Sequence, residues 1–467
     1  MKKNLSVFLG SASVLSLLIN TSFASGFMLQ EQNAVQTGDF GAGGAAIAED
    51  ASTAWFNPAG LVRLTHPQIV AAGNEIWFHT NFTGNITQSI PYQILGQQET
   101  ISAEQHVNNA SGGTNNFVPV FHAAYPINPN LVAAFSVTTP FGLATDYSDA
   151  TFVRYAATKT DLKTIDLSPS LGMKLNNKFS VGFGLDEQRL IASFDTIAGI
   201  PGISHSFPHL FPNFPDNALD TASHNSATDW GMGWHSGVMF QPSNETRFGI
   251  AYHSKIVHHA TGYSSFTGYL ASPDVLQPSA NSIYASQTAN TTVTLPANTM
   301  LSAYHEMNNR WAVMGSVVYT QWDVFKNLTL NNVAALTDIP HEDFPHRALI
   351  TATVPENFRN TWRMSIGSNY KINNQYLLRA GVGYDQNPTN NTDRNLRLPD
   401  GDRYAVALGG RYQANKDLAL DAGWTHEFIK SSSINNTSVM GPQTVTVIGN
   451  SKSNANILGL QLTYSFA

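Results

Sequence analysis

The last stretch of the chain alternates strictly between apolar and polar side chains. Between Asn456 and the C-terminus, one row of alternating positions is small and polar, and the other is wholly apolar and ends in aromatic residues, namely Leu458, Leu460, Leu462, Tyr464 and Phe466. Because successive side chains of a strand point to opposite faces, this pattern predicts a β-strand with one apolar face. Such a face fits the core of a soluble sandwich or the lipid side of a transmembrane β-barrel, whose strands carry aromatic residues at both interfaces.

The same alternation recurs at five other places, where apolar rows start at Phe179, Trp362, Tyr376, Tyr404 and Leu418. Aromatic residues repeatedly stand at the ends of these rows, and charged residues and glycines occupy the opposite rows. A barrel wall with one face in lipid and one face toward the lumen has this pattern. In this interpretation the lipid face includes Phe179, Val181, Leu378, Leu420 and Leu460.

Short and long connections alternate along the chain. Short asparagine-rich turns occur near residues 128–130, 176–177, 243–244, 308–309, 373–374 and 415–416. Long polar stretches separate them, at residues 79–116, 140–163, 191–227, 257–290, 323–358, 385–401 and 429–454. Short turns on one side and long loops on the other are typical of outer-membrane barrels, and soluble sandwiches have no reason to segregate them. The count predicts an all-β fold, a fourteen-stranded antiparallel transmembrane β-barrel with both termini in the periplasm.

The N-terminus divides into two predicted segments ahead of the barrel. Residues 1–24 resemble a secretory signal, with Lys2 and Lys3 before an apolar run and a small-residue cleavage site before Ser25. Residues 25–66 do not alternate and are rich in glycine, alanine and apolar side chains, with a helical piece expected from Ala45 to Ala54. Such a segment predicts an N-terminal hatch that plugs the lumen, followed by the barrel over residues 67–467.

Composition narrows the possible partners and chemistry. The net charge is −7, and it becomes −9 once the two signal lysines are removed, so no broad basic surface for nucleic acid is expected. Cysteine is absent, which excludes disulfides and thiolate metal sites. No mature segment carries about 18 consecutive apolar residues, so no membrane helix is expected. We expect no cofactor, no metal and no enzymatic activity.

Three arginines on the predicted lumenal rows are candidate partners for a ligand carboxylate: Arg363, Arg379 and Arg403. Acidic residues share the same side, which favours an ion-pair network that stiffens the wall. The alternative is that one of them meets an anionic headgroup, because guanidinium groups bind carboxylates in a specific geometry.

An ordered set of motifs resembles the FadL family of outer-membrane long-chain fatty acid transporters. The resemblance spans the mature chain and rests on Ser25-Gly26-Phe27, Gly41 to Ala45, Asn57-Pro58-Ala59, Phe141 to Thr145 and Asp229 to Trp234. The family fold is a fourteen-stranded barrel with an N-terminal hatch, which agrees with the count made from the turns and loops.

The resemblance implies passive uptake with lateral release. Ligand would land in an apolar extracellular groove, move to a pocket against the hatch N-terminus at Phe27, and leave through a gap made by a kink in the third strand. Proline and glycine interrupt that strand at Pro140 and Gly142. We therefore expect the hatch motif Asn57, Pro58 and Ala59 to lie beside the exit residues Thr139, Pro140 and Gly142.

Two aromatic-rich loops are candidates for the outer groove, which we expect to contain Phe207, Leu210, Phe211, Phe214, Tyr263 and Phe266. Exposed apolar clusters usually mark a binding surface, although each loop packing its own small core is an equal alternative. The partners expected from this interpretation are a long-chain fatty acid or another hydrophobic small molecule, outer-membrane lipid and lipopolysaccharide, and the barrel assembly machinery.

Other functions remain open at this stage. The pocket of the family's best-known member uses basic residues whose positions fall near Ile191 and Thr329 here, so a channel for neutral aromatic or aliphatic hydrocarbons is an alternative. A surface adhesin or phage-receptor barrel is another, because long loops offer binding surface. A membrane esterase is disfavoured, because His253, His258 and His259 accompany no nucleophile motif and fit solvated loop histidines.

Overall fold

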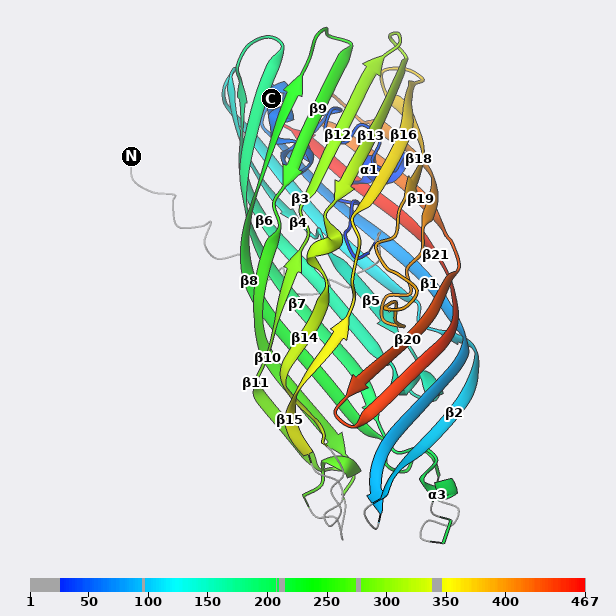
Figure 1. Cartoon of the computed structure of the whole chain (residues 1–467). Coiled ribbons are helices and arrows are strands. Elements are labelled where there is room, and N and C mark those ends of the chain that lie inside the picture. Colours follow the sequence, from blue (N-terminus) through cyan, green and yellow to red (C-terminus); the bar gives the residue numbers. More distant parts are fainter. Residues whose placement is uncertain are drawn as a thin grey trace.

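The computed structural model describes residues 26–94, 97–206, 208–209, 215–273, 279–337 and 347–466. Over these residues the chain forms one antiparallel sheet in which the first segment, β1, pairs along its length with the last, β21. This pairing closes the sheet into an elongated barrel (Figure 1). The predicted signal at residues 1–24 lies outside the described residues.

Seven of the fourteen wall strands are each interrupted once, so the sheet is divided into twenty-one segments. In chain order, with the two parts of an interrupted strand joined by "with", the wall consists of β1 (Gln68–Ile94), β2 (Gln97–Ser111) with β3 (Thr114–Asn128), β4 (Leu131–Thr138) with β5 (Gly142–Asp146), β6 (Lys159–Lys174), β7 (Phe179–Ala198), β8 (Thr221–Phe240), β9 (Thr246–His253) with β10 (Ile256–Gly268), β11 (Ile283–Leu295) with β12 (Asn298–Glu306), β13 (Trp311–Thr320) with β14 (Asn327–Leu336), β15 (Arg347–Pro355) with β16 (Thr361–Lys371), β17 (Tyr376–Asp385), β18 (Arg403–Gln413), β19 (Leu418–Ile429) with β20 (Ser432–Met440), and β21 (Gln443–Ser465). The predicted count of fourteen is confirmed.

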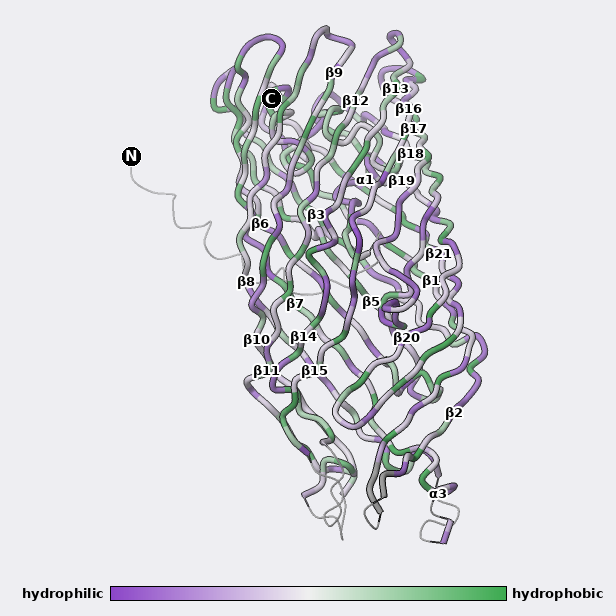
Figure 2. The backbone as a smooth tube through the Cα atoms, viewed as in Figure 1, coloured by the Kyte–Doolittle hydropathy of each residue, from purple (hydrophilic) through white to green (hydrophobic). Residues whose placement is uncertain are grey.

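The register of the wall follows the alternation in the sequence. Leu378, Leu420 and Leu460 expose 42–59% of their surface on the outside, and Phe179 exposes 43%. The intervening positions are buried toward the lumen, as for Arg379. Hydrophobic and hydrophilic residues accordingly alternate along the wall strands (Figure 2). The lipid face predicted from the sequence is therefore confirmed at these positions.

Large parts of the stretches predicted as long polar loops are strands. β1 continues to Ile94 and pairs with β2, and the β20–β21 hairpin spans most of residues 429–454. β1 has 27 residues, whereas about 9–11 suffice to cross a bilayer. The loop prediction was wrong here, because serine, threonine and asparagine dominate these strands and their inward apolar residues, such as Phe82 and Val447, are too widely spaced to stand out as an alternating row.

Residues 26–66 lie against lumenal side chains around the whole wall, and we call them the hatch. Their helices are α1 (Ala34–Asp39), α2 (Thr53–Phe56) and the 3₁₀ helix η1 (Pro58–Arg63). The helical piece expected from Ala45 to Ala54 is wrong except at its end, because Ala48 has left-handed backbone and helix α2 begins only at Thr53.

The remaining helical turns are α3 (Ile203–Ser206) and the 3₁₀ helices η2 (Phe152–Tyr155), η3 (Tyr269–Ala271) and η4 (Trp322–Val324). Among the helices of the described residues, none combines the length and the apolar character that crossing a membrane requires. The hatch lies near the end of the barrel that carries the short turns and the C-terminus, and α3 lies at the opposite end (Figure 1). The hatch therefore closes the lumen toward the end with the short turns.

Candidate ligand pocket and wall break

An apolar cavity lies inside the barrel against the hatch N-terminus. Its volume is about 160 Å³. The lining is mostly aliphatic and aromatic and includes Phe27, Leu143, Leu162, Leu190, Phe194, Val293, Leu328, Val354, Phe358 and Leu398. An engineered cavity of similar volume with comparable walls accepts benzene, so this one has room for at least part of a hydrophobic ligand.

Phe27 closes one side of the cavity. Its ring packs edge-on against Trp322 and Phe325, with centroid separations of 4.8 and 5.6 Å. The preceding residue, Gly26, has a φ of +63°, and a Cβ there would lie 2.7 Å from the Trp322 ring. Glycine is therefore required at this position to seat Phe27, and the Gly26 amide is fixed by Asp400 Oδ2 at 2.9 Å.

One cationic side chain, Arg397, lines the cavity in the described part of the chain. It belongs to the connection between β17 and β18, at residues 386–402, which folds inward. Its guanidinium donates to the carbonyls of Lys159 and Asp195 and to Thr160 Oγ1 at 2.9–3.0 Å. Burial lowers the pKa of Arg397 to about 10, although Asp195 and Glu356 counteract this shift. The group stays cationic at neutral pH and places a positive charge beside the apolar lining.

The third wall strand is kinked between β4 and β5. Thr138 pairs with Asp166 and Gly142 pairs with Lys163, so three residues of this strand face only two of β6. The extra residue disrupts the ladder, as in a β-bulge. Pro140 lies within the kink and has no amide to donate. The kink expected from Pro140 and Gly142 is therefore present.

Hatch residues take the hydrogen bonds that the kink leaves open. Leu29 donates its amide to Pro140 (2.7 Å), and Gly142 donates to the Phe27 carbonyl (2.8 Å). The side chain of Gln32 donates to the Thr139 carbonyl (2.8 Å) and accepts from the Thr139 amide (3.0 Å). These bonds make the hatch N-terminus a substitute for a neighbouring strand.

A break in the wall lies on the other side of the kink. The ladder between β3 and β4 ends at Phe121 and Val137. The described β3 residues from Thr114 to Val120 pair with β1 on one side and with no β4 residue on the other. Leu29 of the hatch packs against Val118 and Val120 at this break. Because unpaired backbone at membrane depth requires a protein or aqueous lining, the hatch is what closes this opening.

The Asn57-Pro58-Ala59 motif does not lie beside the kink, and that prediction was wrong. Asn57 Nδ2 donates to the Val238 carbonyl on β8 (3.2 Å), and the Ala59 carbonyl accepts from Ser180 on β7 (2.8 Å). Gly182 admits this contact, since a Cβ there would lie 2.3 Å from the Pro58 carbonyl carbon.

The distance between the motif and the kink follows from the strand register. Gly182, which contacts the motif, pairs with Gly172 on β6. Asp166 lies six residues from Gly172 on the same strand and pairs with Thr138, the last β4 residue before the kink. Six residues correspond to about 20 Å along a strand. The residues that close the kink are therefore those from Phe27 to Gln32, and the Asn57 motif seats the hatch elsewhere on the wall.

The three lumenal arginines are paired with protein carboxylates and line no part of the cavity. Their ion pairs, including those to hatch residues Glu31 and Glu49, are Arg363 with Asp385 (3.2 Å) and Glu31 (3.8 Å), Arg379 with Glu49 (2.9 Å) and Asp421 (3.0 Å), and Arg403 with Asp400 (2.7 Å) and Glu427 (3.2 Å). The contacts favour the network interpretation over a ligand headgroup, and part of this network joins the hatch to the wall.

The predicted capture groove is described only in part. Phe207, Leu210, Phe211 and Phe214 lie outside the described residues. Tyr263 and Phe266 belong to β10 and not to a loop, and Phe266 is 1% exposed in a cluster with Ile200 and Ile203. The exposure expected for Phe266 was wrong, because β10 continues to Gly268.

Some important residues had little or no signal in the sequence. Arg397 and Gln32 stand in stretches without alternation, so no face could be assigned to them. Arg189, which lies near the family's basic position, is on the outer face over Trp230. His258 and His253 were expected in a solvated loop, but His258 is fully buried and His253 ends β9 in the lumen.

The chain resembles known proteins over nearly its whole length. Residues 15–466 match the model of the family described as outer membrane protein transport protein (OMPP1/FadL/TodX). The long-chain fatty acid transport protein of Escherichia coli O6:H1 is 26% identical, over 88% of this chain and 89% of the relative. Outer membrane protein P1 of Haemophilus influenzae is 27% identical, with 97% and 98% covered.

Solved structures give the same result for the fold. A FadL homologue of Pseudomonas aeruginosa has a TM-score of 0.76 and 25% identity, with 95% of this chain and all of that chain covered. The toluene transporter TodX of Pseudomonas putida has a TM-score of 0.61 at 15% identity, with 95% and 100% covered, and shares the fold. The chain therefore belongs to the OMPP1/FadL/TodX family of outer-membrane transport proteins.

Proposed function

We propose that the protein is a channel for passive uptake of long-chain fatty acids or similar hydrophobic molecules across the outer membrane. The observation that carries this proposal is the apolar cavity, which is closed on one side by Phe27 and adjoins the kinked strand at Phe141. Relatives of this chain are named for long-chain fatty acid transport. Buried apolar area contributes about 25 cal/mol per Å², so such a cavity binds an alkyl chain without specific polar contacts.

Release would be lateral, through the break beside the kink. Phe27 connects the two places, since its ring contacts the cavity and its carbonyl accepts from Gly142. A ligand that displaces Phe27 would loosen the bonds that close the wall. Release sideways into lipid spares the ligand a second transfer through water, and no energy source is needed if the ligand is consumed downstream.

Arg397 is the residue we assign to a ligand carboxylate. It is the cation on the cavity lining, and charge-assisted bonds between guanidinium and carboxylate are stronger than neutral ones. Replacing it with glutamine keeps polarity and removes the charge. The expected result is weaker binding of oleate, by roughly tenfold if one such bond is lost.

A channel for neutral hydrocarbons is the second candidate. The observation that favours it is that the Arg397 guanidinium already donates three hydrogen bonds within the protein, which leaves few free donors for a carboxylate. The two candidates differ in their response to Arg397→Gln. If the protein is a fatty acid channel, the variant should bind labelled oleate more weakly than the wild type and bind toluene equally well. If it is a channel for neutral hydrocarbons, the wild type should bind toluene more tightly than oleate, and the substitution should change neither affinity.

The route is tested by deleting Gly142. The deletion removes one of the residues that make the kink, so the strand is expected to straighten and pair with β3. Uptake should fall to background while binding of oleate to the purified variant remains. A correctly assembled deletion variant that transports at the wild-type rate would show that passage runs along the barrel axis instead.

A further inference from the structure

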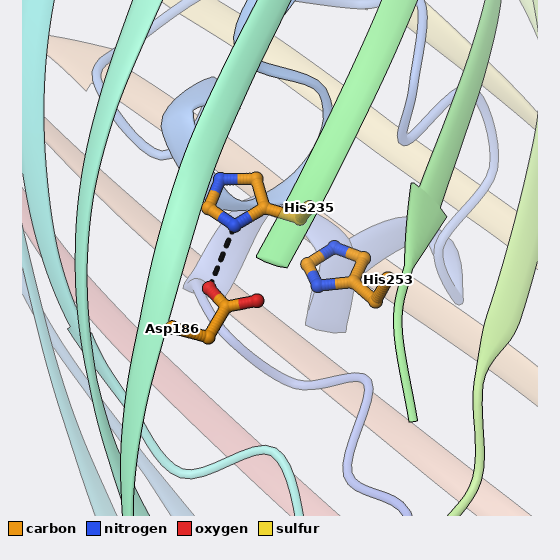
Figure 3. A group of neighbouring side chains, drawn as sticks. All are labelled: Asp186, His235 and His253. Carbon is orange, nitrogen blue, oxygen red and sulfur yellow. Dashed lines mark hydrogen bonds and ion pairs between the residues drawn. The ribbon is translucent and has the colours of Figure 1, made fainter. Parts of the chain in front are cut away.

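A cluster of metal-ligand side chains lies between the wall and the hatch, away from the ligand cavity lining. Asp186, His235 and His253 come from the neighbouring strands β7, β8 and β9 and point toward one another in the lumen (Figure 3). One ligand atom from each lies within 4.8 Å of the other two. Asp186 and His235 are buried, and His253 is half-buried.

The hatch fixes which nitrogen of each histidine faces the cluster. His235 Nε2 lies 3.1 Å from the Ala54 carbonyl, and His253 Nε2 lies 3.0 Å from the Trp55 carbonyl. A carbonyl only accepts, so both Nε2 atoms carry the hydrogen. In the neutral rings the lone pair is therefore on Nδ1. Metal-ligating histidines are typically oriented in this way, by donation from the other ring nitrogen to a carbonyl.

The contact between His235 and Asp186 calls for a cation. His235 Nδ1 lies 2.7 Å from Asp186 Oδ1. A neutral ring would place a lone pair against a carboxylate oxygen, which is repulsive. Either a proton lies between these two atoms, on the ring or on the carboxyl group, or the two atoms move apart to bind a metal ion together.

A second carboxylate, Asp166, increases the demand for positive charge. Ser168 bridges Asp166 and Asp186, and Gln188 donates to Asp166 at 2.9 Å. In the described part of the chain, the hydrogen-bond and ion-pair partners of the two carboxylates are Ser168, Gln188 and His235, with no lysine or arginine among them. Two buried carboxylates without a fixed cation are costly, and a divalent ion would neutralise both.

There is also space for an ion. A small cavity of about 20 Å³ beside the cluster is lined by Asp166, Asp186 and His253, and His235 is not among its lining residues. A volume of about 10–15 Å³ suffices for one water, so the cavity holds a single ion or water. The ligand atoms of one zinc ion lie roughly 3.3 Å apart, given Zn–N and Zn–O bonds near 2.1 Å, and small side-chain rotations would reach this spacing.

We propose that Asp186, His235 and His253 bind one divalent transition-metal ion that fastens the hatch to the wall. Two imidazoles and one carboxylate suit Zn²⁺ and its neighbours in the first transition row, and the absence of thiolates disfavours soft ions. An ion on Nδ1 makes each Nε2–H a stronger donor to the carbonyls of Ala54 and Trp55. Bound metal thereby strengthens the attachment of α2, whichever hydrophobic molecule the channel carries.

The binding test uses the full-length barrel in detergent, stripped with chelator and titrated with Zn²⁺ by calorimetry. We expect about one bound equivalent, and affinity at least tenfold weaker in Asp186→Asn and in His253→Gln. Co²⁺ absorption in the visible range reports the same site independently. If Asp186→Asn fails to fold, His253→Gln still tests the site, because His253 is only half-buried and its replacement should disturb folding less.

The matched control is His122→Gln. His122 is also buried and also contacts a hatch carbonyl, that of Gln32, at 3.0 Å, but its Nδ1 faces the Ser136 hydroxyl at 2.8 Å. Zn²⁺ affinity should be unchanged in this variant. Absence of stoichiometric binding to the wild type, or equal binding by the His235→Gln/His253→Gln double variant, would overturn the site.

Fastening is measured by hydrogen exchange of the α2 amides. In the wild type, Zn²⁺ should slow exchange at Asn57, whose amide donates to Thr53, and in Asp186→Asn it should have no effect. Zn²⁺ that binds stoichiometrically without slowing this exchange would refute the fastening role.

Discussion

The amide of Gly142 donates a 2.8 Å hydrogen bond to the carbonyl oxygen of Phe27, the residue whose ring closes one side of the lumenal cavity. One residue of the hatch thus takes part in both the pocket and the wall. A shift of the Phe27 backbone that opens the cavity would therefore also disturb the closure of the third strand.

Gln32 should control how tightly the hatch closes the kink. Gln32→Ala removes both hydrogen bonds to Thr139, worth about 1 kcal/mol each. We expect faster hydrogen exchange at the Thr139 amide and faster leakage of small solutes through reconstituted protein. Gln30→Ala is the matched control, because Gln30 is half-buried and the bond it donates comes from its backbone amide. Equal leakage in the two variants would contradict this role of Gln32.

Ala59→Lys should unseat the hatch and not block the exit. Ala59 is fully buried, and its carbonyl accepts from Ser180 on β7, about 20 Å from the kink. A lysine there has no space and no carboxylate partner, so the hatch should shift and leakage should rise. Single-channel conductance measures this. Loss of oleate uptake with conductance unchanged would instead place the motif at the exit.

Arg379→Gln should weaken the attachment of the hatch. The change leaves Glu49 and Asp421 without their ion pairs to this residue, and breaking a buried pair typically costs about 3–5 kcal/mol. Arg411 also contacts both carboxylates and should reduce the loss. Protease accessibility of residues 40–50 is the measurement. Arg310→Gln, in an exposed turn, should behave as the wild type.

Leu460→Arg tests the lipid face. Leu460 is 59% exposed on the outer wall, and an arginine near the bilayer midplane costs about 2–4 kcal/mol. Denaturant unfolding from lipid vesicles should show that loss. Leu460→Ala should cost much less, since it adds no charge to lipid. An arginine variant as stable as the alanine variant would place Leu460 outside the hydrocarbon.

Alternation in the sequence was sufficient to predict the membrane part of the wall. Strand geometry assigns each residue to one face, so Leu378 and Arg379 could be placed on opposite sides without any tertiary information. The asparagine turns fixed the strand count in the same local way. Beyond the membrane this signal ends, and there β1, β2, β20 and β21 continue as strands that the polar sequence did not reveal.

What the sequence by itself determined is the closed barrel, its lipid face, its short turns and the kink at Pro140, because each depends on residues adjacent along one strand. The tertiary structure alone decided what meets in the lumen. Phe27 and Gly142 are 115 positions apart, and Arg397, Glu49 and His253 contact their partners only after the wall closes around the hatch. Their neighbours are set by register and by where the hatch packs, which no short segment of the chain encodes.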